Sequence, residues 1–354
     1  MHRVTLQPSG LQFDVEDGES VLSAALRQGY VLPYGCRNGA CGSCKGRILD
    51  GSVDYGTYQK KALSDEEKAQ GKALFCQAQP LGPLVIEART VGAAKDIQVK
   101  TLPCRIHKME RCADDVMVLH LKLPANERLQ FLAGQYIEFL LKDGSRRSFS
   151  MGNAPHDDEH LQLHVRHVAG GQFTDHVFNR MKERDILRFE GPLGTFFLRE
   201  DSDKPAVFVA SGTGFAPIKS ILEHAFKKGI SRPMTLYWGG RRPKDLYMNA
   251  LPLQWAAEHP HFKYVPVVSD ALPEDGWTGR TGFVHRAAME DFPDLSGCQV
   301  YACGVPVMVD SARRDFVQQC RLPETEFYAD SFTTQADLAD PAQPAVVAPA
   351  SSPK

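Results

Sequence analysis

The stretch Tyr34-Gly35-Cys36-Arg37-Asn38-Gly39-Ala40-Cys41-Gly42-Ser43-Cys44 decides the fold of the N-terminal part of this chain. Its three cysteines have the spacing C-x4-C-x2-C, and a fourth cysteine, Cys76, follows after a long gap. The three glycines of the stretch permit the φ values and the close backbone approach that a tight loop around sulfur atoms requires. We therefore expect a loop whose backbone N–H groups point inward at the cysteine sulfurs.

The four-cysteine spacing is typical of the ligands of a plant-type 2Fe–2S cluster, which is held by four thiolates. A structural zinc site is the first alternative, but zinc sites usually have a short C-x2-C pair in each half, and Cys76 has no cysteine near it in the sequence. A disulfide framework is the second alternative, although nine is an odd number of cysteines and no secretory signal precedes them. We predict the cluster, with Cys36, Cys41, Cys44 and Cys76 as its metal ligands.

Length and composition indicate a globular protein of two or three domains. The chain has 354 residues, of which 43% are hydrophobic and 24% charged, and its formal net charge is −2. The sequence contains no run of 18 apolar residues and no basic block, so it gives no support to a membrane span or to nucleic-acid binding. Because free cysteines suit a reducing compartment and the first residues lack an apolar signal region, we expect a cytoplasmic protein.

The pattern of hydrophobic residues changes twice and predicts a multidomain α+β and α/β protein. Residues 1–90 mix short strands with two helices, in the order expected of a β-grasp ferredoxin domain. Residues 102–198 are rich in strands that glycine and proline separate, which predicts a small antiparallel β-barrel. Residues 199–333 alternate buried strands with helices, which predicts a parallel α/β domain. We expect a linker at 91–101 and a disordered tail at 334–354, which is rich in Ala, Pro and Ser.

Two segments of the barrel region indicate a flavin site. Arg147-Ser148-Phe149-Ser150 follows a strand and a turn, and Gly170-Gly171-Gln172-Phe173-Thr174 leads into a helical pattern. A glycine turn at a helix N-terminus binds anions, because free N–H groups and the helix dipole face the ligand. Arg147 would clamp the same pyrophosphate, Phe149 would offer a flat face to a flavin ring, and Ser150 would bond near its reactive edge. The alternative is a solvated arginine beside an ordinary core phenylalanine.

A second dinucleotide site is indicated after the apolar run 206–210. Ser211-Gly212-Thr213-Gly214-Phe215-Ala216-Pro217 joins this predicted strand to a helix, which we expect to open at Pro217 and end at Gly229. A G-x-G turn between a buried strand and a helix is the context that nucleotide binding requires. Cys303-Gly304 follows a later predicted strand. We interpret Cys303 as a positioning residue, with a buried structural thiol as the alternative, because no adjacent base would activate it as a nucleophile.

These motifs together resemble the ferredoxin–NADP reductase superfamily, in the form that carries an N-terminal plant-type 2Fe–2S ferredoxin domain. The resemblance implies a six-stranded flavin-binding barrel, closed by the turn Gly191-Pro192-Leu193-Gly194, and FAD as the flavin. The residues that it implies for FAD are Arg147, Phe149, Ser150, His164, Val165, Arg166, Gly171, Gln172, Phe173 and Thr174. Those that it implies for the nicotinamide cofactor are Gly212, Thr213, Gly214, Pro217, Cys303 and Gly304. Phe332 would cover the flavin face, with an ordinary core aromatic as the alternative.

Three cofactors in one chain predict an electron-transfer enzyme, since a flavin can stand between a two-electron hydride donor and a one-electron cluster. The domain order resembles reductases of multicomponent oxygenases. It resembles still more the CDP-6-deoxy-Δ3,4-glucoseen reductases, through Tyr34-Gly35-Cys36, Ala302-Cys303-Gly304 and Phe327-Tyr328-Ala329-Asp330. This implies an NAD(P)H-dependent oxidoreductase, expected to be a monomer, whose partner protein is a pyridoxamine-phosphate-dependent dehydrase or a Rieske or diiron oxygenase. A non-enzymatic redox sensor is disfavoured, because it would not need the flavin and nicotinamide sites.

The choice between NADH and NADPH depends on the residue after Ser269. NADPH-using members of the superfamily tend to place an arginine there, which pairs with the 2′-phosphate, whereas this chain has Asp270. A carboxylate accepts a bond from a ribose 2′-hydroxyl but repels a phosphate, so we predict a preference for NADH. Arg241 and Arg242 point the other way, because either could reach a phosphate from the neighbouring loop.

Overall fold

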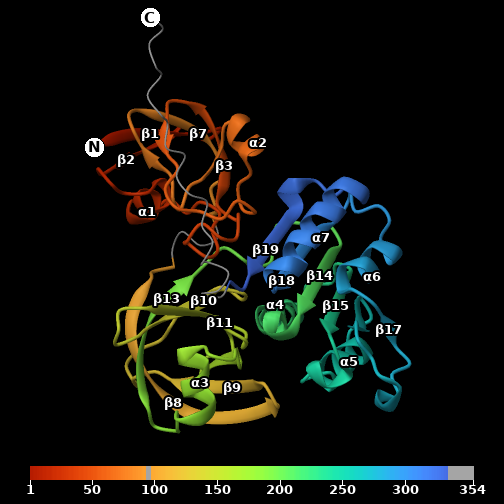
Figure 1. Ribbon diagram of the computed structural model, residues 1–354. Coiled ribbons are helices and arrows are strands. Elements are labelled where there is room, and N and C mark those ends of the chain that lie inside the picture. The colour runs from red at the N-terminus through yellow and green to blue at the C-terminus, as the bar shows by residue number, and fades with distance from the viewer. Residues whose placement is uncertain (93–96, 334–354) are drawn as a thin grey trace, which may run out of the picture. The chain divides into compact units, whose positions relative to one another are not determined.

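The computed structural model describes residues 1–92 and 97–333, which form two compact units (Figure 1). The first unit contains the four-cysteine segment, and the second contains both of the segments expected to bind dinucleotides. The predicted tail and residues 93–96 of the predicted linker lie outside the described residues.

The first unit is a mixed sheet with two short helices. Its sheet has the order β2-β1-β7-β3-β5, and β4 and β6 form a separate pair. Because β1 pairs antiparallel with β2 and parallel with β7, the last strand lies inside the sheet, as in a β-grasp fold. The elements are β1 (His2–Gln7), β2 (Leu11–Val15), α1 (Val21–Arg27), β3 (Lys45–Asp50), β4 (Val53–Asp54), α2 (Asp65–Ala69), β5 (Lys72–Leu74), β6 (Gln79–Pro80) and β7 (Leu84–Glu87).

Both helices of the first unit begin at serine caps. The Ser20 side chain accepts a hydrogen bond from the Ser23 N–H at 3.2 Å, which starts α1. Ser64 and Glu67 form a reciprocal capping box at α2, in which each side chain accepts the backbone N–H of the other residue. The segment between α1 and β3 has no regular structure, and it carries three of the four cysteines.

The second unit begins with an antiparallel six-stranded barrel, as the resemblance implied. The strand order is β11-β10-β13-β8-β9-β12. A bridge between Met151, just after β11, and Leu163 of β12 links the two end strands and closes the barrel. The elements are β8 (Lys100–Ala113), β9 (Val116–Lys122), β10 (Tyr136–Leu140), β11 (Arg146–Ser150), β12 (Leu161–Arg166), α3 (Gln172–Asn179) and β13 (Ile186–Leu193).

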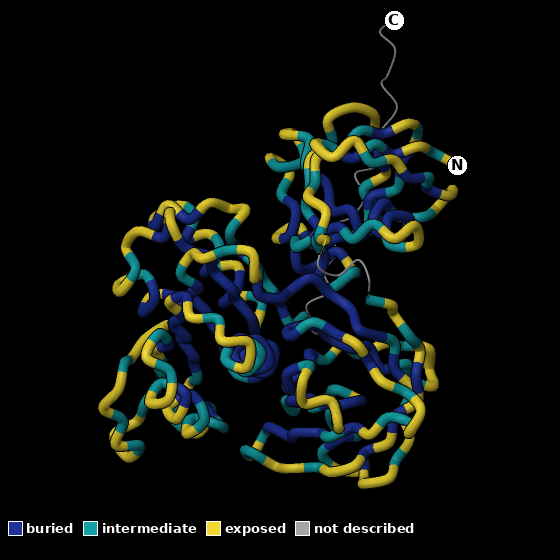
Figure 2. Tube along the Cα trace, turned by 180° about the vertical axis from the view of Figure 1, so that it is seen from behind, coloured by how far each residue is buried: buried dark blue, intermediate teal, exposed yellow. Residues whose placement is uncertain are grey.

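The rest of the second unit is a six-stranded parallel sheet of order β17-β16-β15-β14-β18-β19. Helices α4 and α5 cover one face and α6 and α7 the other, so the central strands are buried (Figure 2). The strands are β14 (Ala206–Ser211), β15 (Met234–Gly240), β16 (Phe262–Val268), β17 (Arg280–Thr281), β18 (Gln299–Gly304) and β19 (Phe327–Ser331). The helices are η2 (Gly212–Gly214), α4 (Phe215–Lys228), η3 (Pro243–Asp245), α5 (Ala250–Glu258), η4 (Pro273–Asp275), α6 (Val284–Asp291), α7 (Pro306–Gln319) and η5 (Glu324–Glu326).

Several element boundaries differ from those expected from the sequence: strand β8, for example, begins at Lys100, within the predicted linker. Helix α4 begins at Phe215, two residues before Pro217, because the short helix η2 runs directly into it. The proline still lies in the first turn, where its missing N–H has no partner to lose. Most of the predicted turn at 191–194 is instead strand, because β13 runs to Leu193, and Gly194 follows it with a φ of +90°.

Candidate functional site

The first unit gathers four cysteines that are distant in sequence. Cys36, Cys41 and Cys44 come from the irregular segment before β3, and Cys76 lies between β5 and β6. Thiol hydrogen bonds link Cys36 with Cys41 and Cys44 with Cys76, and electrostatic interactions connect the two pairs. Hydrogen bonding from Cys36, followed by that of Ser43, lowers the pKa of the Cys41 thiol to about 6 although it is buried. The sulfurs are thus assembled as two pairs.

This arrangement provides the thiol donors that a cluster of two irons requires. Among the residues that the structure describes, no group of three or more His, Cys, Asp or Glu side chains is placed to hold one metal ion. Four thiolates shared between two irons have no common centre, whereas a structural zinc ion requires four ligands around one point. Four cysteine thiols in two pairs are the kind of donor set that a 2Fe–2S cluster takes.

The backbone of the cysteine loop also fits a sulfur-rich group. N–H groups of the loop interact with the cysteine sulfurs as expected, and the Cys36 N–H lies 3.4 Å from the Cys41 sulfur. A Cβ added at Gly35 would lie 3.3 Å from that sulfur. Gly39 has φ +80°, and a Cβ there would approach the Thr57 carbonyl oxygen to 2.7 Å. The loop thus wraps closely around the space that the four sulfurs enclose.

In the barrel, strand β11 separates the two kinds of side chain expected at a flavin site. Arg147 and Phe149 share one face of the strand, and Ser150 points to the other. The Phe149 ring is half-buried and lies 5.4 Å from the ring of Phe173, measured between centroids. This contact brings β11 and the start of α3 together. Phe173 itself is 4% exposed in the barrel core, so its side chain packs rather than faces a ligand.

The start of helix α3 leaves backbone N–H groups available for an anion. Gly171 is the N-cap and provides no side-chain cap, so the first N–H groups of the helix have no partner within it. The Thr174 hydroxyl is engaged with the backbone of Val168 in both directions, at 3.1 and 3.0 Å. Any pyrophosphate contact here would therefore come from the backbone, with the threonine fixing the turn.

Strand β12 places its three expected site residues in different surroundings. Val165 is fully buried in the barrel core and can offer a cofactor only its backbone. Arg166 donates from Nε to Asp115 Oδ2 at 2.8 Å. His164 is 5% exposed, and burial lowers its pKa to about 3. Its Nδ1 lies 2.7 Å from the hydroxyl of Tyr247, a residue of the nicotinamide domain that the sequence analysis missed.

The barrel and the nicotinamide domain also meet at Ser150. Its hydroxyl donates a hydrogen bond to Asp330 Oδ2 at 3.0 Å, and the two residues are 6% and 8% exposed. Asp330 pairs with Cys303 in the register of β18 and β19. Burial, with a smaller effect of Asp330, raises the pKa of the Cys303 thiol well above its usual range, so this thiol is neutral. Asp330 was not predicted as a site residue; its signal was a lone carboxylate within an otherwise mostly apolar terminal strand.

The G-x-G turn packs tightly at the carboxyl ends of β14 and β18. Gly212 has φ +54°, and a Cβ there would lie 2.9 Å from Nη1 of Arg166. The backbone of Cys303 leaves no room for a Cβ at Gly214. Phe332 is half-buried against the same domain, and its N–H donates to the Gly304 carbonyl at 2.8 Å. The structure therefore brings the predicted residues Gly212, Gly214, Cys303, Gly304 and Phe332 into one region.

The remaining predicted residues lie near this turn or at its outer edge. Thr213 is 7% exposed, and Pro217 is buried in the first turn of α4. Asp270 is exposed, and its N–H donates to the Arg241 carbonyl at 2.8 Å. Asp270 thus follows β16 directly beside the end of β15. Ligands of open α/β sheets bind at such carboxyl ends. Asp270 therefore lies where the adenosine ribose is expected.

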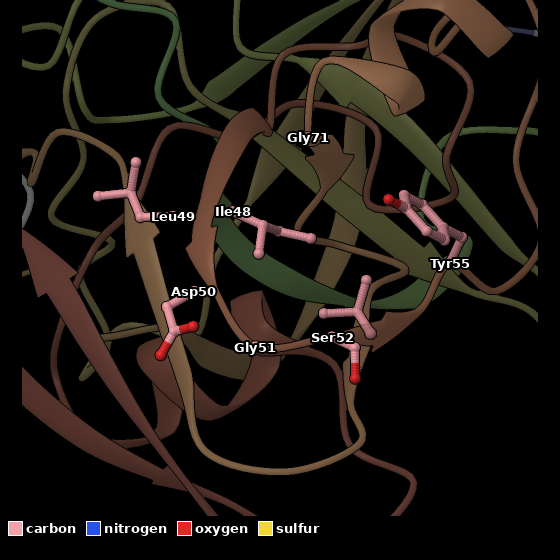
Figure 3. A pocket seen from close by; sticks show the side chains of 8 residues that line it. Ile48, Leu49, Asp50, Gly51, Ser52, Tyr55 and Gly71 are labelled. Atoms are coloured by element: carbon pink, nitrogen blue, oxygen red, sulfur yellow. The ribbon is translucent and has the colours of Figure 1, made fainter.

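A hollow of about 380 Å³ on the first unit is not part of either site (Figure 3). It is lined by Ile48, Leu49, Asp50, Gly51, Ser52, Val53, Tyr55 and Gly71. Its one carboxylate, Asp50, is exposed to solvent, so the hollow lacks the convergent buried polar groups of a ligand site. None of the four cysteines lines it.

Nine cysteines are present, and none of them forms a disulfide. Cys36 and Cys112 are partly exposed, and the others are buried. Separately, among the described residues we find no helix with the length and apolar character that crossing a membrane requires.

Three known domain families match consecutive segments of the chain, in the same order as the sites described above. The 2Fe-2S iron-sulfur cluster binding domain matches residues 4–81, the oxidoreductase FAD-binding domain residues 103–198, and the oxidoreductase NAD-binding domain residues 208–314. Fold and sites together define an iron–sulfur flavoprotein reductase. It is an NAD(P)H-dependent oxidoreductase whose cofactors are a 2Fe–2S cluster, FAD and NADH, which confirms the predicted class and cofactors.

The chain belongs to the family of reductases that carry these three domains in one polypeptide. It is 41% identical over 329 residues, 93% of this chain and 98% of the relative, to CDP-6-deoxy-L-threo-D-glycero-4-hexulose-3-dehydrase reductase of Yersinia pestis. It is 36% identical to reductase component 2 of terephthalate 1,2-dioxygenase from Comamonas sp, over 94% of this chain and 98% of the relative. The crystal structure of Amycolatopsis cytochrome P450 reductase GcoB is similar with a TM-score of 0.75 and 35% identity, covering 94% of this chain and 99% of that one.

Proposed function

We propose that this chain passes electrons from NADH through FAD to its 2Fe–2S cluster and then to a separate acceptor protein. The observation that carries the proposal is the buried contact of Ser150 with Asp330 beside Cys303. It supports a flavin ring on β11 next to a nicotinamide ring at the carboxyl ends of β14 and β18. FAD, when bound, supplies the conversion between a two-electron hydride donor and a one-electron acceptor.

We assign the residues of the second unit to three tasks. Arg147 and the backbone of Gly171–Thr174 bind the FAD pyrophosphate, and Phe149 packs on the flavin ring. Ser150 lies at the reacting edge, with its proton held on Oγ and donated to Asp330. The glycines of the turn at Gly212–Gly214 let the NADH pyrophosphate approach the backbone closely. Cys303 and Phe332 bound the space for the nicotinamide ring.

Cys36, Cys41, Cys44 and Cys76 would hold the cluster, which would supply a one-electron centre, and their thiol contacts support this set of ligands. We place the domain boundaries at 1–90, 102–198 and 199–333, and we propose that the chain acts as a monomer, since one chain carries all three sites. Its free thiols support a reducing compartment such as the cytoplasm.

The partner is an electron-acceptor protein, because the relatives are reductase components of dehydrase and oxygenase systems. We propose that it is a pyridoxamine-phosphate-dependent sugar dehydrase, because identity to the dehydrase reductase is 41% against 36% for the dioxygenase component. An oxygenase is the second candidate. Reduction of each purified class of acceptor, with NADH as donor, decides between them.

We propose NADH as the preferred donor, because Asp270 is exposed at the expected ribose position. A difference of about 1.4–2.8 kcal/mol between the cofactors corresponds to a preference of roughly 10- to 100-fold. Steady-state kcat/KM with NADH and NADPH, on the native protein and on Asp270→Arg, measures this preference. An unchanged ratio in Asp270→Arg would remove Asp270 as a determinant.

Anaerobic mixing with NADH tests the proposed order of electron transfer. We expect the flavin absorbance to bleach first and the cluster signal in electron paramagnetic resonance to appear afterwards. Flavin released by heat should be FAD by chromatography, because the start of α3 offers a pyrophosphate site that FMN would not use. Recovery of FMN alone, or cluster reduction that precedes flavin reduction, would contradict the assignment.

A further inference from the structure

Two arginines follow β15 directly, at the edge of the sheet where the adenosine ribose is expected. Gly240 ends β15 and pairs with Val268, the last residue of β16. The Arg241 carbonyl accepts the Asp270 N–H at 2.8 Å. Arg241, Arg242 and Asp270 therefore lie at the carboxyl ends of neighbouring parallel strands, where a 2′-phosphate would also be placed.

Arg242 is already held by a carboxylate of the next loop. Its Nε donates to Asp275 Oδ2 at 2.6 Å and its Nη2 to Asp275 Oδ1 at 2.7 Å. Both guanidinium–carboxylate bonds are short, which makes this a bidentate pair. The side chains of Arg242 and Asp275 are 28% and 18% exposed, so the pair is partly shielded from water and competing ions.

Backbone hydrogen bonds fix both ends of this ion pair. Asp275 ends the short helix η4, and its Oδ2 also accepts the Leu272 N–H at 2.9 Å. On the other side, Asp245 Oδ2 accepts the backbone N–H groups of Arg241 and Arg242 at 2.9 and 3.0 Å. Because both segments are already ordered, little further freedom is lost when the pair forms, unlike in most surface ion pairs.

We propose that Asp275 is a second determinant of NADH use, because it occupies Arg242, the arginine that would otherwise bind the 2′-phosphate of NADPH. The inference rests on the proposed function, since it concerns the same cofactor site. Arginine binds phosphate with the fork geometry that it uses for a carboxylate, so a 2′-phosphate must displace Asp275 to gain this partner. Asp270 acts differently, by direct repulsion of the phosphate.

Glu274 provides a matched control on the same loop. Its Oε1 lies 3.7 Å from Arg242 Nη2, and its side chain is 69% exposed. Neutralising Glu274 removes the same charge as neutralising Asp275 but leaves the bidentate pair intact. Asp275→Asn retains an oxygen that can accept the Leu272 N–H, so the loop keeps its turn.

The experiment measures kcat/KM for NADH and NADPH with ferricyanide as acceptor, using the full-length holoprotein. We expect Asp275→Asn to raise kcat/KM for NADPH by about tenfold or more, while kcat/KM for NADH changes less than about threefold. Adding Arg242→Gln should cancel the gain. Glu274→Gln should change kcat/KM for NADPH by less than about twofold, as for an exposed charge. Arg242→Gln alone should not raise kcat/KM for NADPH, because it leaves the Asp275 carboxylate unpaired and a free carboxylate repels a phosphate.

Calorimetric binding of adenosine 2′,5′-bisphosphate and of 5′-AMP gives a readout that does not depend on electron transfer. Asp275→Asn should tighten binding of the bisphosphate only, and the gain should weaken as ionic strength rises. Melting curves check that each variant is folded, and Asp275→Ser replaces Asp275→Asn if the latter does not fold.

The inference is overturned if the NADPH to NADH ratio of Asp275→Asn is unchanged, if the gain survives Arg242→Gln, or if Glu274→Gln reproduces it. A gain of NADPH use in Arg242→Gln alone would also overturn it, because Arg242 would then not be the group that binds the phosphate. Failure of the proposed function has a different signature, since NADH would then not reduce the flavin of the native protein.

Discussion

The Ser150 hydroxyl and the Asp330 carboxylate connect a barrel strand to the last strand of the nicotinamide domain through one buried hydrogen bond. A hydrogen bond to a charged group contributes about 1.5–3 kcal/mol. If all of it acts on the barrier, Ser150→Ala and Asp330→Ala should each slow flavin reduction by NADH about 10- to 100-fold. Stopped-flow absorbance under anaerobic conditions measures the rate.

The double variant distinguishes a joint role from two separate ones. Because the residues act as one pair, Ser150→Ala/Asp330→Ala should be no slower than the slower single variant. Ser148→Ala is the control, since this exposed hydroxyl contacts Glu138 instead, and it should leave the rate within about twofold. Multiplicative losses in the double variant would show that the two residues act independently.

Burial of the His164 imidazole makes the second unit sensitive to acid. Its folded pKa is about 3 against an ordinary value of 6.5. Between these values the unfolded chain binds a proton that the folded chain does not, so stability is present above pH 6.5 and is lost as pH falls toward 3. Each pH unit in this window should cost up to about 1.4 kcal/mol of unfolding free energy.

Urea unfolding followed by tryptophan fluorescence tests this pH dependence. All three tryptophans, Trp238, Trp255 and Trp277, lie in the second unit, so the signal reports on the unit that contains His164. His164→Gln should flatten the decline in stability between pH 6.5 and 4, which lies between the ordinary and the folded pKa of His164. The exposed His156→Gln is the control and should keep the native slope. A native slope in His164→Gln would exclude His164 as the cause.

At the scale of elements, the cysteine loop depends on glycine where the backbone is crowded. Gly39→Ala would place a Cβ 2.7 Å from the Thr57 carbonyl oxygen and 3.0 Å from the Tyr58 Cα, at φ +80°. We expect this variant to lose most of its iron and acid-labile sulfide while it keeps its flavin. Gly10→Ala is matched in φ, at +71°, but its Cβ meets nothing within 4 Å. It should cost about 1–2 kcal/mol of stability at most and keep its cluster. Equal cluster loss in both variants would mean that backbone strain, not crowding, is decisive.

Some helices and strands could be predicted from the sequence and others could not. The changes of hydrophobic pattern along the chain are local signals, and the structure confirms the three kinds of domain that they predict. Strand β17 has two residues, too few for a period to show. Strand β19 has no alternating burial, and its place in the sheet comes from pairing with β18, which is information that a local pattern does not contain.

The same limit applies to the site. Ser150 was expected from its motif, but its partner Asp330 is 180 residues away. Arg242 was read as a candidate for phosphate binding, and the structure pairs it with Asp275, which is 33 residues further on. Sequence motifs identify the candidate residues. Whether their side chains can bind a ligand depends on contacts between distant segments, which the strand order brings together.

At the scale of the whole molecule, the cofactors should act in series. Cys41→Ser removes a proposed cluster ligand from the first unit and leaves the second unit unchanged. Ferricyanide accepts electrons directly from flavin, whereas cytochrome c should require the cluster. We expect the variant to keep most of its NADH–ferricyanide activity and to lose cytochrome c reduction by about tenfold or more, which corresponds to roughly 1.4 kcal/mol.

Iron content and the electron paramagnetic resonance signal should show that the cluster is absent from Cys41→Ser. Cys104→Ser is a suitable control, because this buried thiol belongs to the barrel core and not to the cluster loop. It should retain both activities in proportion to its flavin content. An equal loss of both activities in Cys41→Ser would argue against a linear order of cofactors.

The exposure of the cysteines has a practical consequence for handling the protein. Cys36 and Cys112 are the partly exposed thiols among the nine, and iron coordination would consume Cys36. A maleimide reagent should then react with the holoprotein at Cys112, near the end of β8. The barrel therefore offers a natural attachment point for a fluorophore or an electrode surface, and no cysteine has to be removed to use it.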